Sequence, residues 1–288
     1  MTRIKTVSLN RYAFGFIGAG KLAGSVIRGL MRAKFCAPGD IIASEPNEQI
    51  RSALKQDLDV NVTTENTEVA KNAKVIFIGV KPGLVLPVLR GLHVDLIAGR
   101  VRPAGGLANK LVISLAAGVR LKNMEAVSKA RFMRALTNTP SAVCRAATAI
   151  ARGTRTTNED VARTKKIFSA IGIIVEVEED QIDAVTALAG SGPAFIYTVI
   201  EALAEGGKKV GLAPNVALTL ATQTVLGAAQ LALESRKSPG ELIKMVVTPG
   251  GTTAAGLDMM KKLGTSESLI AAIEAATKRG QEMAQENL

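Results

Sequence analysis

The chain has 288 residues, 47% of them hydrophobic but only 3% aromatic, and a net charge of +11. This length allows one large or two ordinary domains, and the aliphatic composition favours helices packed on one another or on a parallel sheet. Residues 1–175 carry 27 Lys+Arg against 11 Asp+Glu (+16), and residues 176–288 carry 9 against 14 (−5). Because the basic residues are scattered and no nucleic-acid motif accompanies them, we expect an anionic nucleotide and no nucleic acid as partner. The sequence shows no uninterrupted apolar run long enough to span a bilayer, so we expect no membrane partner either.

The cysteine content excludes a disulfide framework. Only Cys36 and Cys144 are present, without paired spacing, and a zinc or other metal site is not predicted. Two unpaired cysteines suit a reducing compartment, so we expect a cytoplasmic protein. Residues 1–11 contain three basic residues and no acid, which keeps a mitochondrial location as the alternative.

The front half alternates short apolar runs with amphipathic stretches. Strands are predicted at Ala13–Ile17, Ile41–Ser44, Val75–Gly79, Leu111–Ser114, Arg131–Ala135 and Ile173–Glu176. Helices are predicted between them, among others at Leu22–Arg32, Glu48–Gln56 and Val161–Ala170. This alternation predicts a Rossmann-type, doubly wound parallel sheet with helices on both faces. The segment His93–Asn109, which contains Pro103, is predicted to be a surface loop.

The pattern changes near Asp180, because everything downstream has helical periodicity. Helices are predicted at Ala194–Lys209, Asn215–Leu233, Pro239–Val246, Thr253–Leu263 and Glu267–Gln285. We therefore predict an α/β fold in two domains: residues 1–178 bind a dinucleotide, and residues 179–288 form an all-α domain for oligomerisation and substrate binding. The long Ala/Leu-rich faces of so small a bundle require a partner subunit.

A glycine motif joins the first predicted strand to the first helix. Gly18, Gly20 and Ala23 give the G-x-G-x-x-A form of the dinucleotide fingerprint. The first glycine permits the tight turn, the second lets the backbone approach a pyrophosphate, and the alanine allows close helix–sheet packing. The predicted cofactor-binding residues of this loop are Gly18, Ala19, Gly20, Lys21 and Leu22.

Glu45 ends the second predicted strand, where this fold selects between cofactors. An acid there accepts hydrogen bonds from ribose hydroxyls and repels a 2′-phosphate, which favours NADH over NADPH. Asn47 and Arg51 nearby are able to serve a phosphate, so both cofactors stay open.

Two further segments follow strands of the predicted sheet. Ligands of doubly wound sheets bind at the carboxyl ends of the strands. The residues predicted there to contact the cofactor are Val80, Lys81 and Pro82 after one strand and Ala116, Ala117 and Gly118 after the next.

A second cradle lies near the end of the chain, in Thr248-Pro249-Gly250-Gly251-Thr252-Thr253, directly before a helical pattern. Glycines at a helix start let N–H groups converge on an anion.

Acid–base groups are scarce: His93 is the only histidine, and no Lys or Arg occurs between Lys166 and Lys208. Reduction of a protonated imine needs a positioned hydride donor but little proton transfer, whereas carbonyl reduction needs an acid. The pattern favours a C=N substrate bearing a carboxylate.

These segments carry a specific resemblance across nearly the whole chain. Those that resemble the pyrroline-5-carboxylate reductase family are Gly15–Ala23, Val80-Lys81-Pro82, Ala116-Ala117-Gly118, Thr137-Asn138-Thr139-Pro140, Asp183–Ala194 and Thr248–Leu257. The resemblance implies reduction of 1-pyrroline-5-carboxylate to L-proline with NADH or NADPH, the last step of proline synthesis. It also implies a homodimer with interlocked helical domains that assembles to a decamer.

The same resemblance assigns roles to individual residues. It implies that Gly250, Gly251 and Thr252 offer N–H groups to the substrate carboxylate and that Thr253, the expected catalytic residue, faces the ring nitrogen. It implies that Asn66 contacts the cofactor and that Asn138 lines its nicotinamide side.

The chain departs from the family at three places. Val247 stands where a small residue is usual, Glu45 stands where some members have serine, and His93–Asn109 is long. The alternatives are another imine or hydroxy-acid reductase of the same architecture and a nucleotide-binding protein without catalysis.

Overall fold

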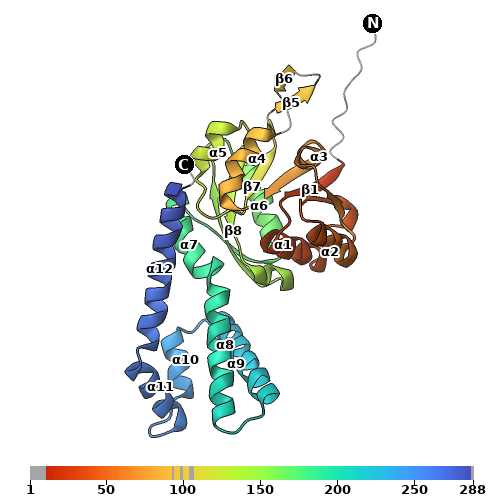
Figure 1. Ribbon diagram of the computed structural model, residues 1–288. Helices are drawn as coiled ribbons and strands as arrows, with labels where there is room; N and C mark the ends of the chain where they lie inside the picture. Colours follow the sequence, from red (N-terminus) through yellow and green to blue (C-terminus); the bar gives the residue numbers. More distant parts are fainter. Residues whose placement is uncertain (1–10, 93, 98–99, 104–106, 287–288) are drawn as a thin grey trace. The chain divides into compact units, whose positions relative to one another are not determined.

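The computed structural model describes residues 11–92, 94–97, 100–103 and 107–286 (Figure 1). By its internal contacts the chain divides into two compact units, Met1–Gly190 with Ala276–Leu288, and Ser191–Ala275. The long C-terminal helix α12 (Thr265–Glu286) contributes to both units.

An eight-stranded sheet forms the centre of the first unit. Its strands lie in the order β10-β9-β8-β7-β4-β1-β2-β3. Their bounds are β1 Tyr12–Ile17, β2 Ile41–Ser44, β3 Asn61–Thr63, β4 Ala73–Ile78, β7 Leu111–Ser114, β8 Arg131–Leu136, β9 Ala146–Arg152 and β10 Gly172–Glu176. The helices of this unit are α1 Lys21–Arg32, α2 Glu48–Leu58, α3 Asn66–Asn72, α4 Val85–Gly91, α5 Leu121–Val127, α6 Asn158–Ser169 and α7 Ile182–Val185. The predicted Rossmann-type α/β architecture is confirmed.

The prediction of a fully parallel sheet is wrong at one place. β8 and β9 pair antiparallel, with Met133 opposite Arg152, and every other pair in this sheet is parallel. A short 3₁₀ segment, Thr139–Val143, joins the two strands. A parallel crossover needs a dozen or more residues, so this connection turns the chain straight back. Neither β9 nor β3 was predicted from the sequence.

The prediction of a surface loop over His93–Asn109 is also wrong. β5 (Val94–Ile97) and β6 (Arg100–Pro103) pair as an antiparallel two-stranded ribbon separate from the main sheet. His93 lies outside the described residues.

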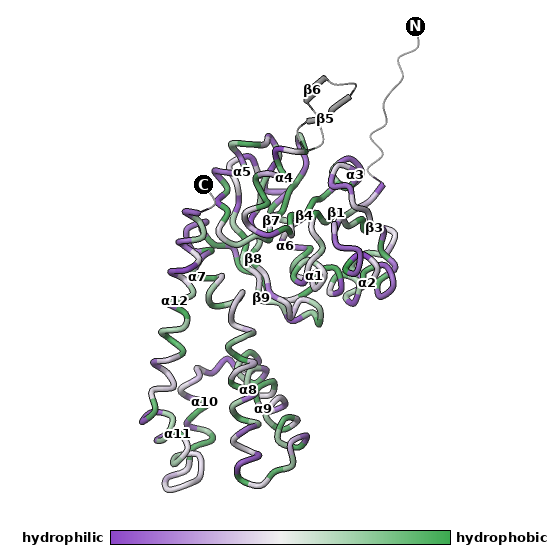
Figure 2. The backbone as a smooth tube through the Cα atoms, in the orientation of Figure 1, coloured by the Kyte–Doolittle hydropathy of each residue, from purple (hydrophilic) through white to green (hydrophobic). Residues whose placement is uncertain are grey.

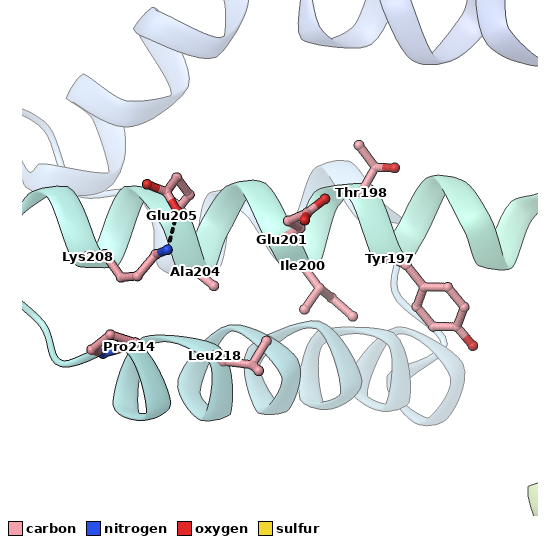
Figure 3. Close-up of a pocket in the computed structure, with 9 residues that line it drawn as sticks. All are labelled: Tyr197, Thr198, Ile200, Glu201, Ala204, Glu205, Lys208, Pro214 and Leu218. Carbon is pink, nitrogen blue, oxygen red and sulfur yellow. Dashed lines mark ion pairs between the residues drawn. The ribbon is translucent and has the colours of Figure 1, made fainter.

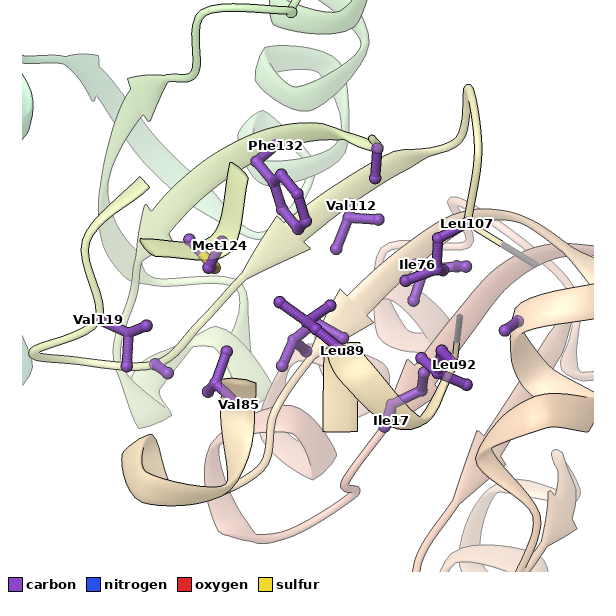
Figure 4. Close-up of a cluster of buried hydrophobic side chains, with 14 of the residues drawn as sticks. Ile17, Ile76, Val85, Leu89, Leu92, Leu107, Val112, Val119, Met124 and Phe132 are labelled. Atoms are coloured by element: carbon purple, nitrogen blue, oxygen red, sulfur yellow. The ribbon is translucent and has the colours of Figure 1, made fainter. Parts of the chain in front are cut away.

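Two apolar clusters cover the two faces of the main sheet, because neighbouring strand residues point to opposite faces. On one face Ile76, Val112 and Phe132 pack with Val85 and Leu89 of α4 (Figure 4). On the other face the Phe16 and Phe77 rings stack with centroids 4.5 Å apart, beside α1, α2 and α6. This rigid layer fixes the strand ends at which the candidate site is built.

Downstream of Asp180 the described residues, through 286, contain helices and no strand. Besides α7 and α12 these are α8 Gly192–Lys209, α9 Pro214–Ser235, α10 Pro239–Val246 and α11 Thr252–Lys262. Between α7 and α8 the helix widens into a π-helical segment, Thr186–Gly190, which the periodicity did not predict.

The second unit buries little of its apolar surface. Its buried cluster consists of Ala204, Ala217 and Ala221, with Ile200 packed against them. Hydrophobic residues recur along α8 and α9 (Figure 2), and many of them are exposed, Leu226 to 55%. An exposed apolar surface of this extent marks an interaction site.

By length and composition, two helical stretches are apolar enough to cross a membrane: Glu179–Lys209 and Pro214–Ser235. In the most apolar 18 residues of each stretch, 11% are buried. The sequence has no uninterrupted apolar run of that length, and these two stretches qualify by their mean hydropathy and their few charged residues. One or two such helices also occur in proteins outside membranes, and a subunit interface presents the same kind of surface.

Candidate active site

The loop from β1 to α1 has the geometry of a dinucleotide cradle. Gly18 has φ +80°, and a Cβ there would lie 2.6 Å from Val80 Cγ1 and 2.7 Å from Val80 N, so this position requires glycine. Gly20 is the N-cap of α1, has no side-chain cap, and would place a Cβ in open space. The helix N-terminus is therefore accessible to an anion, which fits a pyrophosphate.

Close helix–strand packing at the third fingerprint position is also present. Ala23 is buried, and a Cβ added at Gly79 would lie 2.8 Å from its side chain. A larger residue at either position would push α1 away from the end of β4.

Glu45 follows β2 and reaches the glycine loop. Its Oε2 accepts a hydrogen bond from Ala19 N at 3.1 Å, and its Oε1 accepts one from Asn47 N at 3.2 Å. The guanidinium of Arg51 donates to the carbonyls of Glu45 and Pro46, both at 2.7 Å. The carboxylate is thus held beside the loop, where a ribose would lie.

Asn66 is held beside the same strand end. Ser44, buried at the end of β2, donates from its hydroxyl to Asn66 Oδ1 at 2.7 Å. This bond places Asn66 at the start of α3 and leaves its amide nitrogen for another acceptor.

A cavity of about 500 Å³ opens at the carboxyl ends of β1, β4, β7 and β8. Its lining includes nine predicted cofactor residues: Gly20, Lys21, Leu22, Val80, Lys81, Pro82, Ala116, Ala117 and Asn138. The remaining lining residues are Gly79, Leu115, Leu136, Thr137, Thr139, Thr186 and Gly190. The structure thus brings segments far apart in the sequence to one strand-end pocket.

Of the predicted cofactor residues Ala116, Ala117 and Gly118, Gly118 does not line this cavity. It has φ +65°, and a Cβ there would lie 3.0 Å from the Cβ of Met283 on α12. Gly118 therefore allows the C-terminal helix to pack directly against the loop that carries Ala116 and Ala117.

A partly buried ionic cluster follows this loop, at Arg120, Arg134, Glu179 and Asp183. Arg120 donates to Asp183 Oδ2 at 2.5 Å, and Arg134, which is 1% exposed, donates to Glu179 Oε1 at 3.2 Å. Glu179 Oε1 also accepts from Leu121 N at 2.5 Å. Burial lowers the pKa of Arg134, and the neighbouring Glu179 opposes that shift. The positive charges of two arginines are thus paired with the negative charges of two carboxylates.

Thr186 and Gly190 of the cavity wall were not among the predicted site residues, although both lie in the segment Asp183–Ala194 that resembles the family. They belong to the π-helical segment between α7 and α8, which reads as ordinary helix in the sequence. The sequence feature that indicates this segment is Ala189-Gly190-Ser191-Gly192. Glycine destabilises a helix interior, so two glycines here indicate a special packing or functional role.

The cradle Thr248–Thr253 lies in the second unit. Gly250 has φ +68°, and Gly251 is the N-cap of α11 without a side-chain cap. The positive φ of Gly250 favours glycine there, and a Cβ on Gly251 would lie 2.4 Å from Thr248 Oγ1, which would have to rotate away. The N-terminus of α11 is therefore accessible to an anion.

A second cavity, of about 560 Å³, lies between α8 and α9 (Figure 3). Of its three charged side chains, Glu205 pairs with Lys208, and the third is Glu201. Ile200, Ala204 and Leu218 supply apolar lining. It contains no glycine cradle, and it belongs to the exposed apolar surface of the helical unit.

A glycine cradle above a strand-end pocket defines a dinucleotide-binding oxidoreductase of the Rossmann class. Comparison with family models agrees: residues 13–118 match "NADP oxidoreductase coenzyme F420-dependent", and residues 179–283 match "Pyrroline-5-carboxylate reductase dimerisation". Pyrroline-5-carboxylate reductase from Pisum sativum is 40% identical over 94% of this chain and 96% of its own length. That from Methanosarcina acetivorans is 39% identical over 93% and 97%.

Among solved structures, Plasmodium falciparum pyrroline carboxylate reductase with NADP bound has a TM-score of 0.84 at 26% identity. The match covers 96% of this chain and 99% of that one. The chain belongs to the pyrroline-5-carboxylate reductase family, and it is an oxidoreductase with a helical oligomerisation domain.

Proposed function

We propose that the protein reduces 1-pyrroline-5-carboxylate to L-proline, the last step of proline biosynthesis. Besides the family membership, the observation that supports this proposal is the composition of the strand-end pocket. Its described lining contains two lysines, four hydroxyl or amide residues and small or apolar residues, but no imidazole and no carboxylate. A protonated imine needs no general acid, because its nitrogen already carries the proton, so such a pocket suits this substrate.

The pocket also suits a nicotinamide dinucleotide, whose chemistry when bound is to supply the hydride. The N-terminus of α1 at Gly20 would hold the pyrophosphate. Lys81 and the Ala116-Ala117 backbone would line the path toward the nicotinamide. The relative solved with NADP bound supports this class of cofactor.

Glu45 favours NADH within that class. Its carboxylate is fixed beside the loop by Ala19 N and Asn47 N, and a fixed negative charge repels a 2′-phosphate. The described hydrogen bonds of Arg51 go to the carbonyls of Glu45 and Pro46, and no described ion pair joins it to this carboxylate.

The second cradle would hold the substrate carboxylate. Gly250, Gly251 and Thr252 would offer N–H groups at the start of α11, where the helix dipole favours an anion. The hydroxyl oxygen of Thr253 would face the ring nitrogen and accept a hydrogen bond from its N–H. Hydride then adds to the carbon of the C=N bond, and the nitrogen keeps its proton as the amine of proline.

The exposed surfaces of α8 and α9 would be covered in a homodimer, in which the helical domains of two subunits pack together. We further propose that dimers assemble to a decamer. The cytoplasmic location stays a prediction, with the mitochondrial one as its alternative.

Purified protein mixed with 1-pyrroline-5-carboxylate tests the activity. The proposal expects substrate-dependent oxidation of NADH or NADPH with proline as the product. Oxidation with a hydroxy-acid precursor alone would favour the alternative reductase.

A further inference from the structure

The wall of the strand-end pocket contains a structural irregularity. After α7 the helix widens into the π-helical segment Thr186–Gly190 before α8 begins at Gly192. Such segments are rare, consist mostly of a single turn within an α-helix, and are frequent at functional sites. Both ends of this one, Thr186 and Gly190, line the cavity.

The side chain of Asn138 ties this segment to the sheet. Asn138 follows β8 and is 7% exposed. Its Nδ2 donates to the carbonyl of Ala189 at 3.0 Å, and its Oδ1 accepts from Ala147 N at 3.2 Å. One amide group thus joins the end of β8, the start of β9 and the fourth residue of the π-helical segment.

A second bond anchors the start of the segment. The hydroxyl of Thr186 donates to the carbonyl of Ile182 at 2.7 Å. At its other end Gly190 packs against the sheet, since a Cβ there would lie 3.7 Å from both Leu136 Cδ2 and Thr186 Cγ2. The segment is therefore fixed at both ends, and Asn138 supplies its side-chain bond to the sheet.

We infer that Asn138 is a positioning residue, which acts on the reaction by holding the π-helical segment against β8 and so setting the shape of the pocket wall. This inference rests on the proposed function of the pocket. It changes the role expected for Asn138, from a direct cofactor ligand to a residue that acts through Ala189.

The substitution Asn138→Asp isolates this role. Aspartate has nearly the same shape and still accepts from Ala147 N, but it lacks the donor for Ala189 and places a carboxylate beside that carbonyl. Asn61→Asp is the matched control, because Asn61 Nδ2 donates to the carbonyl of Ile41 at 3.2 Å and does not line the pocket.

Hydrogen exchange in the cofactor-free protein gives the first readout. Amides of 186–192 should exchange faster in Asn138→Asp and not in Asn61→Asp. Unchanged exchange in Asn138→Asp would overturn the inference, whatever the enzyme reduces.

Kinetics give the second readout. For Asn138→Asp, kcat should fall about tenfold, as for one lost buried hydrogen bond, while the Kd for the reduced cofactor changes less than about threefold. A Kd that rises as much as kcat/KM falls would show direct cofactor contact instead. An unchanged kcat despite faster exchange would also contradict the inference.

A double variant separates action through the segment from independent effects. Thr186→Val removes the hydrogen bond at the start of the segment. In the double variant, kcat should fall by less than the product of the two single fold-changes. Fold-changes in kcat that multiply would overturn the inference. If wild-type protein reduces no imine acid, the proposed function fails, and the exchange experiment still tests the structural link.

Discussion

The Oε2 atom of Glu45 accepts a hydrogen bond from the backbone N–H of Ala19 at 3.1 Å. This contact joins the end of β2 to the middle of the glycine fingerprint. It holds the carboxylate of Glu45 beside the loop, and the proposed preference for NADH rests on this arrangement.

Replacing Glu45 with serine should therefore raise the use of NADPH relative to NADH. Because the carboxylate that repels the 2′-phosphate is lost, the ratio of kcat/KM for NADPH to kcat/KM for NADH should rise about tenfold or more. Steady-state rates with each cofactor at fixed substrate give the ratio. Glu48→Ser, an exposed residue in the first turn of α2, is the control and should leave the ratio unchanged. If Glu45→Ser leaves it unchanged as well, Glu45 does not select the cofactor.

Thr253→Ala should lower kcat/KM for the imine acid about tenfold or more, because one hydrogen bond to the reacting nitrogen is lost. The affinity for reduced cofactor should stay nearly intact, since the strand-end pocket does not include Thr253. Thr253→Ser keeps the hydroxyl and should retain most of the activity. Equal losses in cofactor affinity and in kcat/KM for Thr253→Ala would refute the substrate role.

The ion pair of Asp160 predicts a dependence of stability on pH. Burial raises the pKa of this carboxyl, but hydrogen bonds from Arg131 and Thr157 outweigh that effect, and the net pKa is lowered. A lowered folded-state pKa gives stability that is present above the ordinary value of about 3.9 and is lost as pH falls through the folded value.

Asp160→Asn should therefore cost about 2 kcal/mol of unfolding free energy at neutral pH, as expected for a hydrogen bond between charged groups. The difference from wild type should shrink below about pH 4. Asp59→Asn removes an exposed pair with Lys55 and should change stability by less than about 0.5 kcal/mol. Denaturant unfolding at several pH values measures both, and a pH-independent difference for Asp160→Asn would contradict the assignment.

The apolar surface of α9 predicts the effect of an interface charge. Leu226→Glu should weaken self-association about a hundredfold or more, because a symmetric interface would bury the added charge twice. Gln223→Glu, exposed on the same helix, adds an equal charge at a polar position and should have a smaller effect. Sedimentation at matched concentrations measures both. Wild-type-like association of Leu226→Glu would exclude this surface from the interface.

The sequence predicted the elements of the sheet that have strong local signals. β1, β2, β4 and β7 are largely apolar runs. The glycine fingerprint marks the turn after β1, where Gly18 has φ +80°. The predicted strand ends therefore agree with the observed pocket, because the carboxyl ends of parallel strands share one edge.

The features that the sequence did not reveal depend on long-range contacts. The antiparallel pairing of β9 follows from the short turn at Thr139–Val143, and β3 has only three residues. The π-helical segment at Thr186–Gly190 depends partly on the bond from Asn138, 51 positions away from Ala189. Local periodicity contains no information about such a bond.

The most direct test of the account is an assay of purified protein with 1-pyrroline-5-carboxylate and each reduced nicotinamide in turn. We predict substrate-dependent cofactor oxidation that yields one proline per hydride donor, faster with NADH than with NADPH. No oxidation of either cofactor would contradict the proposed activity.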